Sequence, residues 1–195
     1  MRKLFILLTV LLCLSLQKAN AQEGVEINSI TWATCNVGAF ATFAANPEDT
    51  GMFYQWSRRT AWAATGTFIF WNSSTPTDTS WTTANVPCPK GWRLPTVNEL
   101  RTLNNESKVI SKWTTLNGIN GIHFTDINTG NNIFLPAAGC RGSTDGILGV
   151  VGKYGYYWSS TEYSSNNAYI LYLDGNAYVG DSSKTYGFSV RCVAE

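Results

Sequence analysis

The side chains best suited to molecular recognition are concentrated between residues 162 and 186, where tyrosine, asparagine, serine and aspartate are dense. Tyrosine offers a rigid ring with a polar end, and asparagine and serine form adaptable hydrogen bonds, a combination favoured in antibody paratopes. We therefore predict a ligand-binding surface made of nine residues: Tyr163, Asn166, Asn167, Tyr172, Asp174, Asn176, Tyr178, Asp181 and Tyr186. The alternative is an exposed hairpin of ordinary composition with no ligand.

Side chains that commonly perform catalysis or bind metals are sparse. His123 is the single histidine, which excludes sites with several histidine ligands and weakens any Ser-His or Cys-His mechanism. Glu99 follows Thr96 by three residues, a spacing typical of a capping box, so we expect it to cap a helix. The sequence contains no nucleophile elbow, phosphate-binding loop or pair of acids at helical spacing. We therefore expect a protein that is not an enzyme and uses no metal or cofactor.

The first 21 residues have the pattern of an export signal. Arg2 and Lys3 precede an apolar run, and Ala19 and Ala21 form the small-residue pattern of a cleavage site. The run is too short for a transmembrane helix, and no later segment reaches about 18 apolar residues. We therefore expect a secreted or cell-envelope protein whose mature chain starts at Gln22 and has no transmembrane segment.

The chain carries little charge. Charged residues make up 14% of the 195 residues, and the formal net charge is +1. Removal of Arg2, Lys3 and Lys18 with the signal leaves 11 basic and 13 acidic residues, a formal charge of −2. Neutralising nucleic-acid phosphates requires a basic surface, so we expect no nucleic-acid partner.

Four cysteines follow the signal, namely Cys35, Cys88, Cys140 and Cys192. Their wide spacing does not fit a zinc site, and an even number in an oxidising compartment favours two disulfides. Three pairings are possible. A bond between Cys88 and Cys192 would join the middle of the chain to its last strand, and free buried cysteines are the alternative.

The elements that must position these side chains are mostly short strands. A helix is expected after Thr96, with Val97, Leu100 and Leu103 on one face. Turn residues at 128–130 indicate a hairpin, with strands over 121–126 and 132–135. Alternation over 168–173, followed by Asp-Gly at 174–175, indicates a second hairpin. The aperiodic segment 58–87 is expected to be a long loop, pinned to the body by its tryptophans.

Four motifs carry a family resemblance. They are TWATCNV at 31–37, CPKGWRLPT at 88–96, GYYWSST at 155–161 and GFSVRCV at 187–193. In this order they resemble the Fibrobacter succinogenes major paralogous domain, a family of Bacteroidetes surface and secreted proteins. The resemblance implies one α+β domain over residues 22–195, similar to C-type lectins, with two short helices, small antiparallel sheets and long loops.

The resemblance also bears on function. Related lectins bind sugar through calcium motifs that this chain lacks, and related formylglycine-generating enzymes use two neighbouring cysteines, whereas no cysteine lies near Cys192 in the sequence. We therefore expect a non-catalytic binding or adhesion module for an extracellular protein or glycan. The alternatives are a structural envelope or fimbria-associated component without a ligand, or a variable receptor diversified by a retroelement. Such receptors carry a Tyr/Asn/Ser-rich segment between motifs like the last two.

Overall fold

The computed structural model describes residues 24–67 and 70–195, and the expected signal at residues 1–21 lies outside this part. In two of the four sheets, neighbouring strands come from distant parts of the chain. The first has the order β1 (Gly24–Ile27), β2 (Ile30–Ala33), β15 (Val193–Ala194), β5 (Trp92–Arg93). The second has the order β10 (Leu148–Gly149), β9 (Cys140–Arg141), β14 (Gly187–Phe188), β3 (Phe53–Gln55), β4 (Ala61–Trp62).

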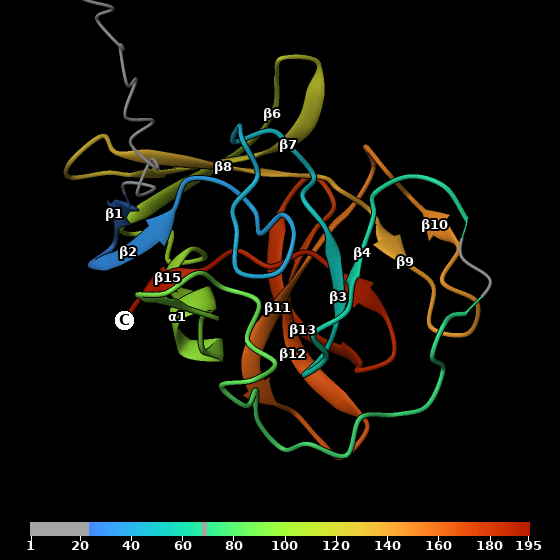
Figure 1. Ribbon diagram of the computed structural model, residues 1–195. Coiled ribbons are helices and arrows are strands. Elements are labelled where there is room, and N and C mark those ends of the chain that lie inside the picture. Colours follow the sequence, from blue (N-terminus) through green and yellow to red (C-terminus); the bar gives the residue numbers. More distant parts are fainter. Residues whose placement is uncertain (1–23, 68–69) are drawn as a thin grey trace, which may run out of the picture.

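The other two sheets are three-stranded antiparallel meanders, in which consecutive strands pair. One consists of β6 (Val109–Leu116), β7 (Ile119–Asp126) and β8 (Asn132–Pro136). The other consists of β11 (Gly155–Glu162), β12 (Asn167–Leu173) and β13 (Ala177–Ser183). Figure 1 shows the first meander across one end of the molecule and the second running away from it through the centre.

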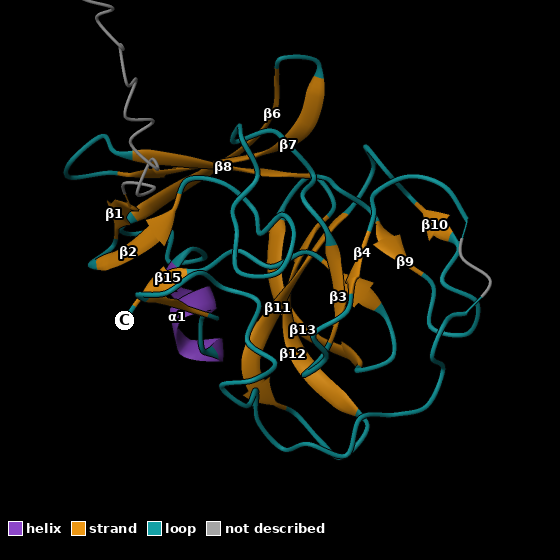
Figure 2. Ribbon diagram, viewed as in Figure 1, coloured by secondary structure: helices purple, strands orange, loops and turns teal. Residues whose placement is uncertain are grey.

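The expected α+β fold with two helices is wrong. The regular secondary structure of the described part of the chain is almost entirely strand, with one short helix, α1 (Val97–Thr102) (Figure 2). The sequence itself offered one capped, helically periodic segment, and the second helix was implied only by the resemblance. The predicted loop over 58–87 is confirmed in part. The two-residue strand β4 lies inside it, and the described residues between β4 and β5 form no strand or helix.

The sheet β11–β12–β13 separates two hydrophobic cores. Successive side chains of a strand point to opposite faces, so the sheet contributes to both. Tyr157 and Leu171 point into one core with Leu100 of α1. Trp158 and Ile170 point into the other, where the Trp158 indole Nε1 donates to the Tyr54 carbonyl at 2.7 Å. The β12–β13 hairpin that carries the predicted site is therefore anchored on both sides.

Helix α1 begins with the expected capping box. The Thr96 hydroxyl accepts from the Glu99 backbone N–H at 3.3 Å, and the Glu99 carboxylate accepts from the Thr96 backbone N–H at 2.7 Å. Arg93 binds both oxygens of the same carboxylate, at 2.6 and 2.8 Å. These bonds, the Arg93 bonds foremost, lower the pKa of Glu99 to about 2 despite partial burial.

The lowered pKa of Glu99 predicts that the folded protein loses stability in acid. The folded-state pKa lies below the ordinary value of 4.5, so the stabilisation is complete above that pH and is lost as the pH falls toward 2. We expect a contribution of about 2 kcal/mol, reduced from the full linkage value because Arg93 is partly exposed. Glu99→Gln should lower the free energy of urea unfolding at pH 6 and flatten its pH dependence between pH 4.5 and 2. Glu106→Gln, at an exposed position, is the control, and equal curves for wild type and Glu99→Gln would contradict this assignment.

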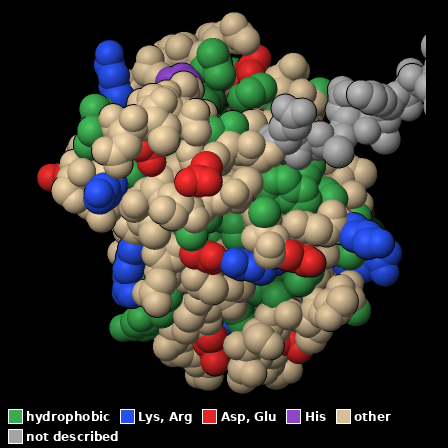
Figure 3. Space-filling view, turned by 90° about the vertical axis from the view of Figure 1, so that its left-hand side faces the viewer, with side chains coloured by type: hydrophobic (Ala, Val, Ile, Leu, Met, Phe, Trp, Pro, Cys, Tyr) green, Lys and Arg blue, Asp and Glu red, His purple; other side chains and the backbone are tan. Residues whose placement is uncertain are grey.

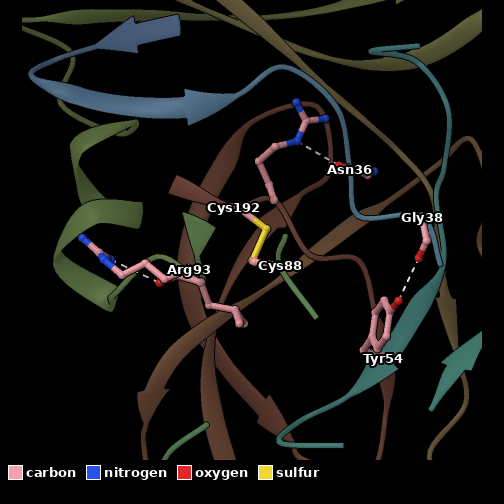
Figure 4. The surroundings of a disulfide bond; sticks show 8 residues. Asn36, Gly38, Tyr54, Cys88, Arg93 and Cys192 are labelled. Atoms are coloured by element: carbon pink, nitrogen blue, oxygen red, sulfur yellow. Dashed lines mark hydrogen bonds between the residues drawn. A yellow bond between two sulfur atoms is a disulfide. The ribbon is translucent and has the colours of Figure 1, made fainter. Parts of the chain in front are cut away.

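One disulfide, Cys88–Cys192, closes a sequence separation of 104 residues (Figure 4). It connects the segment before β5 to the segment before β15, beside the core that contains Trp158. The second disulfide expected from the even cysteine count is not formed. Cys35 is a free buried cysteine, and Cys140 is a free, half-buried cysteine at the start of β9.

Next to the disulfide, the buried Arg191 side chain makes four hydrogen bonds. Its Nε donates to the Asn36 side-chain oxygen at 3.0 Å, and its terminal nitrogens donate to the carbonyls of Ala33, Thr34 and Phe134 at 2.6 to 3.0 Å. Burial lowers the pKa of this guanidinium to about 10, so it remains charged at neutral pH. Arg191 therefore binds the carbonyls of two distant segments, around Ala33 and around Phe134, to the end of the chain.

Candidate functional site

The predicted binding residues lie on the β12–β13 hairpin and its flanks, but the structure divides them. Asn167 opposes Ser183 at one end of the paired strands, and Leu173 opposes Ala177 at the other. Seven residues of strand span roughly 20 Å at about 3.3 Å per residue. Alternation also places neighbouring residues on opposite faces. The nine residues therefore form separate groups on the hairpin and not one continuous surface.

The first group lies where the hairpin leaves β11. The Asn167 side-chain nitrogen donates to the Asp181 carboxylate at 2.7 Å. Tyr163 is 55% exposed and meets the Tyr169 ring edge to face, with 5.2 Å between ring centres. Asn166 is exposed in the connecting turn. Asn167 and Asp181 bind each other directly, so part of their hydrogen-bonding capacity is already used.

The second group lies at the β12–β13 turn. Asp174 and Asn176 are exposed, and the Asp174 carboxylate accepts from the Asn176 backbone N–H at 3.3 Å. Asn176 and Tyr178 also line a shallow depression of about 360 Å³ beside the end of α1. The Asn104 side-chain oxygen, which belongs to another lining residue, is buried without a hydrogen-bond partner in the described part of the chain.

The third group is a set of tyrosines on the face of the sheet that also holds Trp158. Tyr172 lies opposite Tyr156 on one side and opposite Tyr178 on the other, and directly opposed residues share a face. We define the tyrosine row by these three and two neighbours: Tyr154, Tyr156, Tyr172, Tyr178 and Tyr186. Four of them are half-buried, and Tyr178 is 49% exposed.

Ring contacts connect most of the tyrosine row. The Tyr172 ring centre lies 5.7 Å from that of Tyr154 and 5.1 Å from that of Tyr156. Tyr156 and Tyr186 both stack on the buried Phe188, with 4.8 and 5.4 Å between ring centres and interplanar angles of 12° and 16°. Aromatic pairs at these separations stabilise one another beyond simple burial, so the rings are held in place before any ligand arrives.

The electrostatics of the row keep its hydroxyls neutral. Burial raises the pKa of Tyr156, and neighbouring Cys140 and tyrosines add to this effect. The pKa of Tyr172 is raised as well, first by burial and then by Asp174. Both phenols therefore stay protonated at physiological pH, where each hydroxyl can donate and accept a hydrogen bond.

Sequence reasoning missed two members of this group. Tyr154 and Tyr156 precede the predicted segment, Tyr154 just before β11 and Tyr156 within its first residues. The detectable signal was the alternation of Tyr154, Tyr156 and Trp158, because residues two apart in a strand share a face. What the sequence did not contain was the strand register that brings Tyr156 opposite Tyr172.

Comparison of the sequence with known protein families identifies the family of this chain. The family model described as the Fibrobacter succinogenes major domain matches residues 16–194. The chain belongs to this family. No curated protein and no solved structure matches it, and the expected likeness to C-type lectins is therefore not confirmed.

The motifs that suggested the Fibrobacter succinogenes major domain build its scaffold. Trp158 and Arg191 are buried in or beside the cores, and the Cys88–Cys192 disulfide joins two of the motifs. Most of the tyrosine row lies outside these motifs. In the part of the chain that the structure describes, no helix is long and apolar enough to cross a membrane. On the face shown in Figure 3, acidic and basic side chains are scattered among polar ones.

Proposed function

We propose that this protein is a non-catalytic binding module of the cell exterior, exported by residues 1–21, which recognises an extracellular protein or glycan through the tyrosine row. The observation that carries the proposal is the set of three tyrosines that share one sheet face, Tyr156, Tyr172 and Tyr178, together with the ring contacts that join Tyr154 and Tyr186 to them directly or through Phe188. Such rings offer both an apolar face and a hydroxyl at the edge.

The physical argument rests on the entropy cost of binding. A tyrosine has only two freely rotating side-chain bonds, and stacking on neighbours already restricts both. A ligand that packs on such rings orders little that is not ordered beforehand, which raises its affinity. Tyrosine is accordingly enriched among the residues that dominate binding energy in protein interfaces.

The side chains considered for catalysis have structural partners, which supports the non-catalytic part of the proposal. His123 packs on the Phe134 ring with 5.1 Å between ring centres, and Glu99 caps α1. An activity screen on exported peptides and glycans tests this part directly, and turnover abolished by a point substitution would contradict it.

A matched pair of substitutions tests the surface. Tyr178→Ala removes an exposed ring of the tyrosine row, whereas Tyr163→Ala removes a ring of similar exposure at the other end of the hairpin. We expect Tyr178→Ala to weaken binding of a ligand selected on a glycan and extracellular-protein array at least tenfold, because ring contacts near the centre of an interface dominate its energy.

Tyr163→Ala should leave the dissociation constant within about twofold of the wild-type value. Tyr163→Ala and Tyr178→Ala should both melt at nearly the wild-type temperature. Tyr172→Ala should weaken binding as well and also destabilise the fold, because this ring is half-buried among three others. A larger effect of Tyr163→Ala than of Tyr178→Ala would move the binding surface to the Asn167 end of the hairpin.

A further inference from the structure

The long loop between β4 and β5 contributes to a second concave surface, whose lining residues do not include any member of the tyrosine row. Its first part is fixed by the buried guanidinium of Arg141, which donates to the carbonyls of Ala63, Thr65 and Gly66 at 2.6 to 2.9 Å. Further on, the Trp71 indole donates to the Ser143 carbonyl at 3.0 Å. The loop is therefore held by specific bonds at two points, as a preformed site requires.

Between these anchors and the end of β3 lies an open cleft of about 480 Å³, a size typical of small-ligand sites. Its lining combines cationic, carboxamide and aromatic side chains, chiefly Arg58, Arg59, Trp62, Phe70, Asn72 and Asn85. Phe70 at the rim is 82% exposed, more than any other large hydrophobic residue in the described part of the chain. An apolar ring so exposed at the edge of a cleft suggests a contact surface for a ligand.

The two arginines give the cleft a positive charge without a carboxylate bound to either. In the described residues the ion pairs are Arg93–Glu99 and Lys184–Glu162, which involve neither arginine of the cleft. Arg58 donates to the Ser74 carbonyl and hydroxyl at 2.6 and 3.0 Å, and Arg59 lies over the Phe40 ring at 4.4 Å.

Asp78 is the one acid that lines the cleft, so the lining carries one excess positive charge. The pKa of Arg58 is lowered by burial and raised again by Asp78. Arg59 is exposed and makes no hydrogen bond in the described part of the chain, which leaves its five donors available.

We propose that this cleft binds a sugar acid, with the ring carboxylate held by Arg59 and Arg58. The remaining lining fits the rest of such a ligand. Asn85 makes no side-chain hydrogen bond within the described residues, and the side-chain oxygen of Asn72 is occupied by Ser74, which leaves its amide nitrogen as a donor. Amide groups of this kind can form hydrogen bonds with sugar hydroxyls, and the rings of Trp62 and Phe70 can pack on the apolar face of a pyranose.

The test compares acidic ligands with neutral counterparts on the chain from residue 22 to 195. Titration calorimetry with trigalacturonic acid against galactotriose of the same linkage, and with sialyllactose against lactose, distinguishes a uronic acid from a sialic acid as the source of the carboxylate. We expect one acidic ligand to bind with at least tenfold higher affinity than its neutral partner. The affinity should fall as salt rises from 50 to 500 mM.

Arg59→Gln should reduce that affinity at least tenfold with little change in melting temperature, because this side chain is exposed and, within the described residues, makes only the ring contact with Phe40. Lys112→Gln, which removes one positive charge from the exposed face of β6, should change it less than twofold. Arg58→Gln should also weaken binding, with its melting temperature recorded because Arg58 holds Ser74.

Equal affinity for acidic and neutral ligands would overturn the proposal. Equal effects of Arg59→Gln and Lys112→Gln would do the same, as would the absence of binding by either acid at 10 mM, roughly the weak limit for a specific sugar site. Tyr178→Ala should leave sugar-acid affinity unchanged, so failure of this proposal and failure of the tyrosine-row proposal are separate results.

Discussion

The double substitution Cys88→Ala and Cys192→Ala should lower the free energy of unfolding by about 4 kcal/mol. The disulfide closes a separation of 104 residues, and in the chain-entropy model a loop of this length restricts the unfolded ensemble by about 4 to 5 kcal/mol. Urea unfolding at pH 7, with and without reductant, measures the loss. Cys140→Ala is the matched control, since it removes a free cysteine and should cost about 1 kcal/mol or less.

The same bond predicts the thiol count of the unfolded chain. The protein from residue 22 onward should react at two thiols, Cys35 and Cys140, when it is denatured without reductant. A count of zero would mean that a second disulfide forms after all. A stability loss below 1 kcal/mol in the double variant would show that the unfolded chain is already compact around this bond.

Arg191→Met should lower the free energy of unfolding by about 3 to 5 kcal/mol, as much as loss of the disulfide. Methionine retains most of the volume but leaves the Asn36 oxygen and three backbone carbonyls without their donor in a buried place. Thermal and urea unfolding measure the effect. Arg101→Met on the exposed side of α1 is the control and should change stability by less than about 0.5 kcal/mol.

A loss below 1 kcal/mol in Arg191→Met would mean that water enters and satisfies the carbonyls. Hydrogen exchange distinguishes this case, because the amide of Ala33 bonds to the Cys192 carbonyl and would lose protection if the region opened.

Local signals in the sequence predicted local structure well. Thr96 and Glu99 predicted the start of α1 to the residue, and the turns at 128–130 and 174–175 predicted two hairpins. These features depend on side chains a few residues apart, whose geometry the chain alone determines. A third hairpin was missed: Asn117 and Gly118 both have positive φ, 48° and 84°, as the tight turn between β6 and β7 requires.

The prediction was weaker where distant residues meet. The tyrosine-rich segment was read as one surface, but pairing of β12 with β11 and β13 places Asn167 and Tyr172 on opposite faces. The cleft beside Arg58 escaped notice because its lining is gathered from a loop without periodicity. Two disulfides were expected among the four cysteines, yet Cys35 and Cys140 are free, because pairing depends on a separation in space that no spacing in the sequence determines.

The position of β15 limits the order in which this protein can fold. This strand at residues 193–194 lies between β2 and β5, so the first strands of the domain lack their neighbour until the last have been synthesised. The partner of Cys88 and the buried Arg191 arrive with the same segment. The first sheet and the disulfide can therefore be completed only once this last segment of the domain is present.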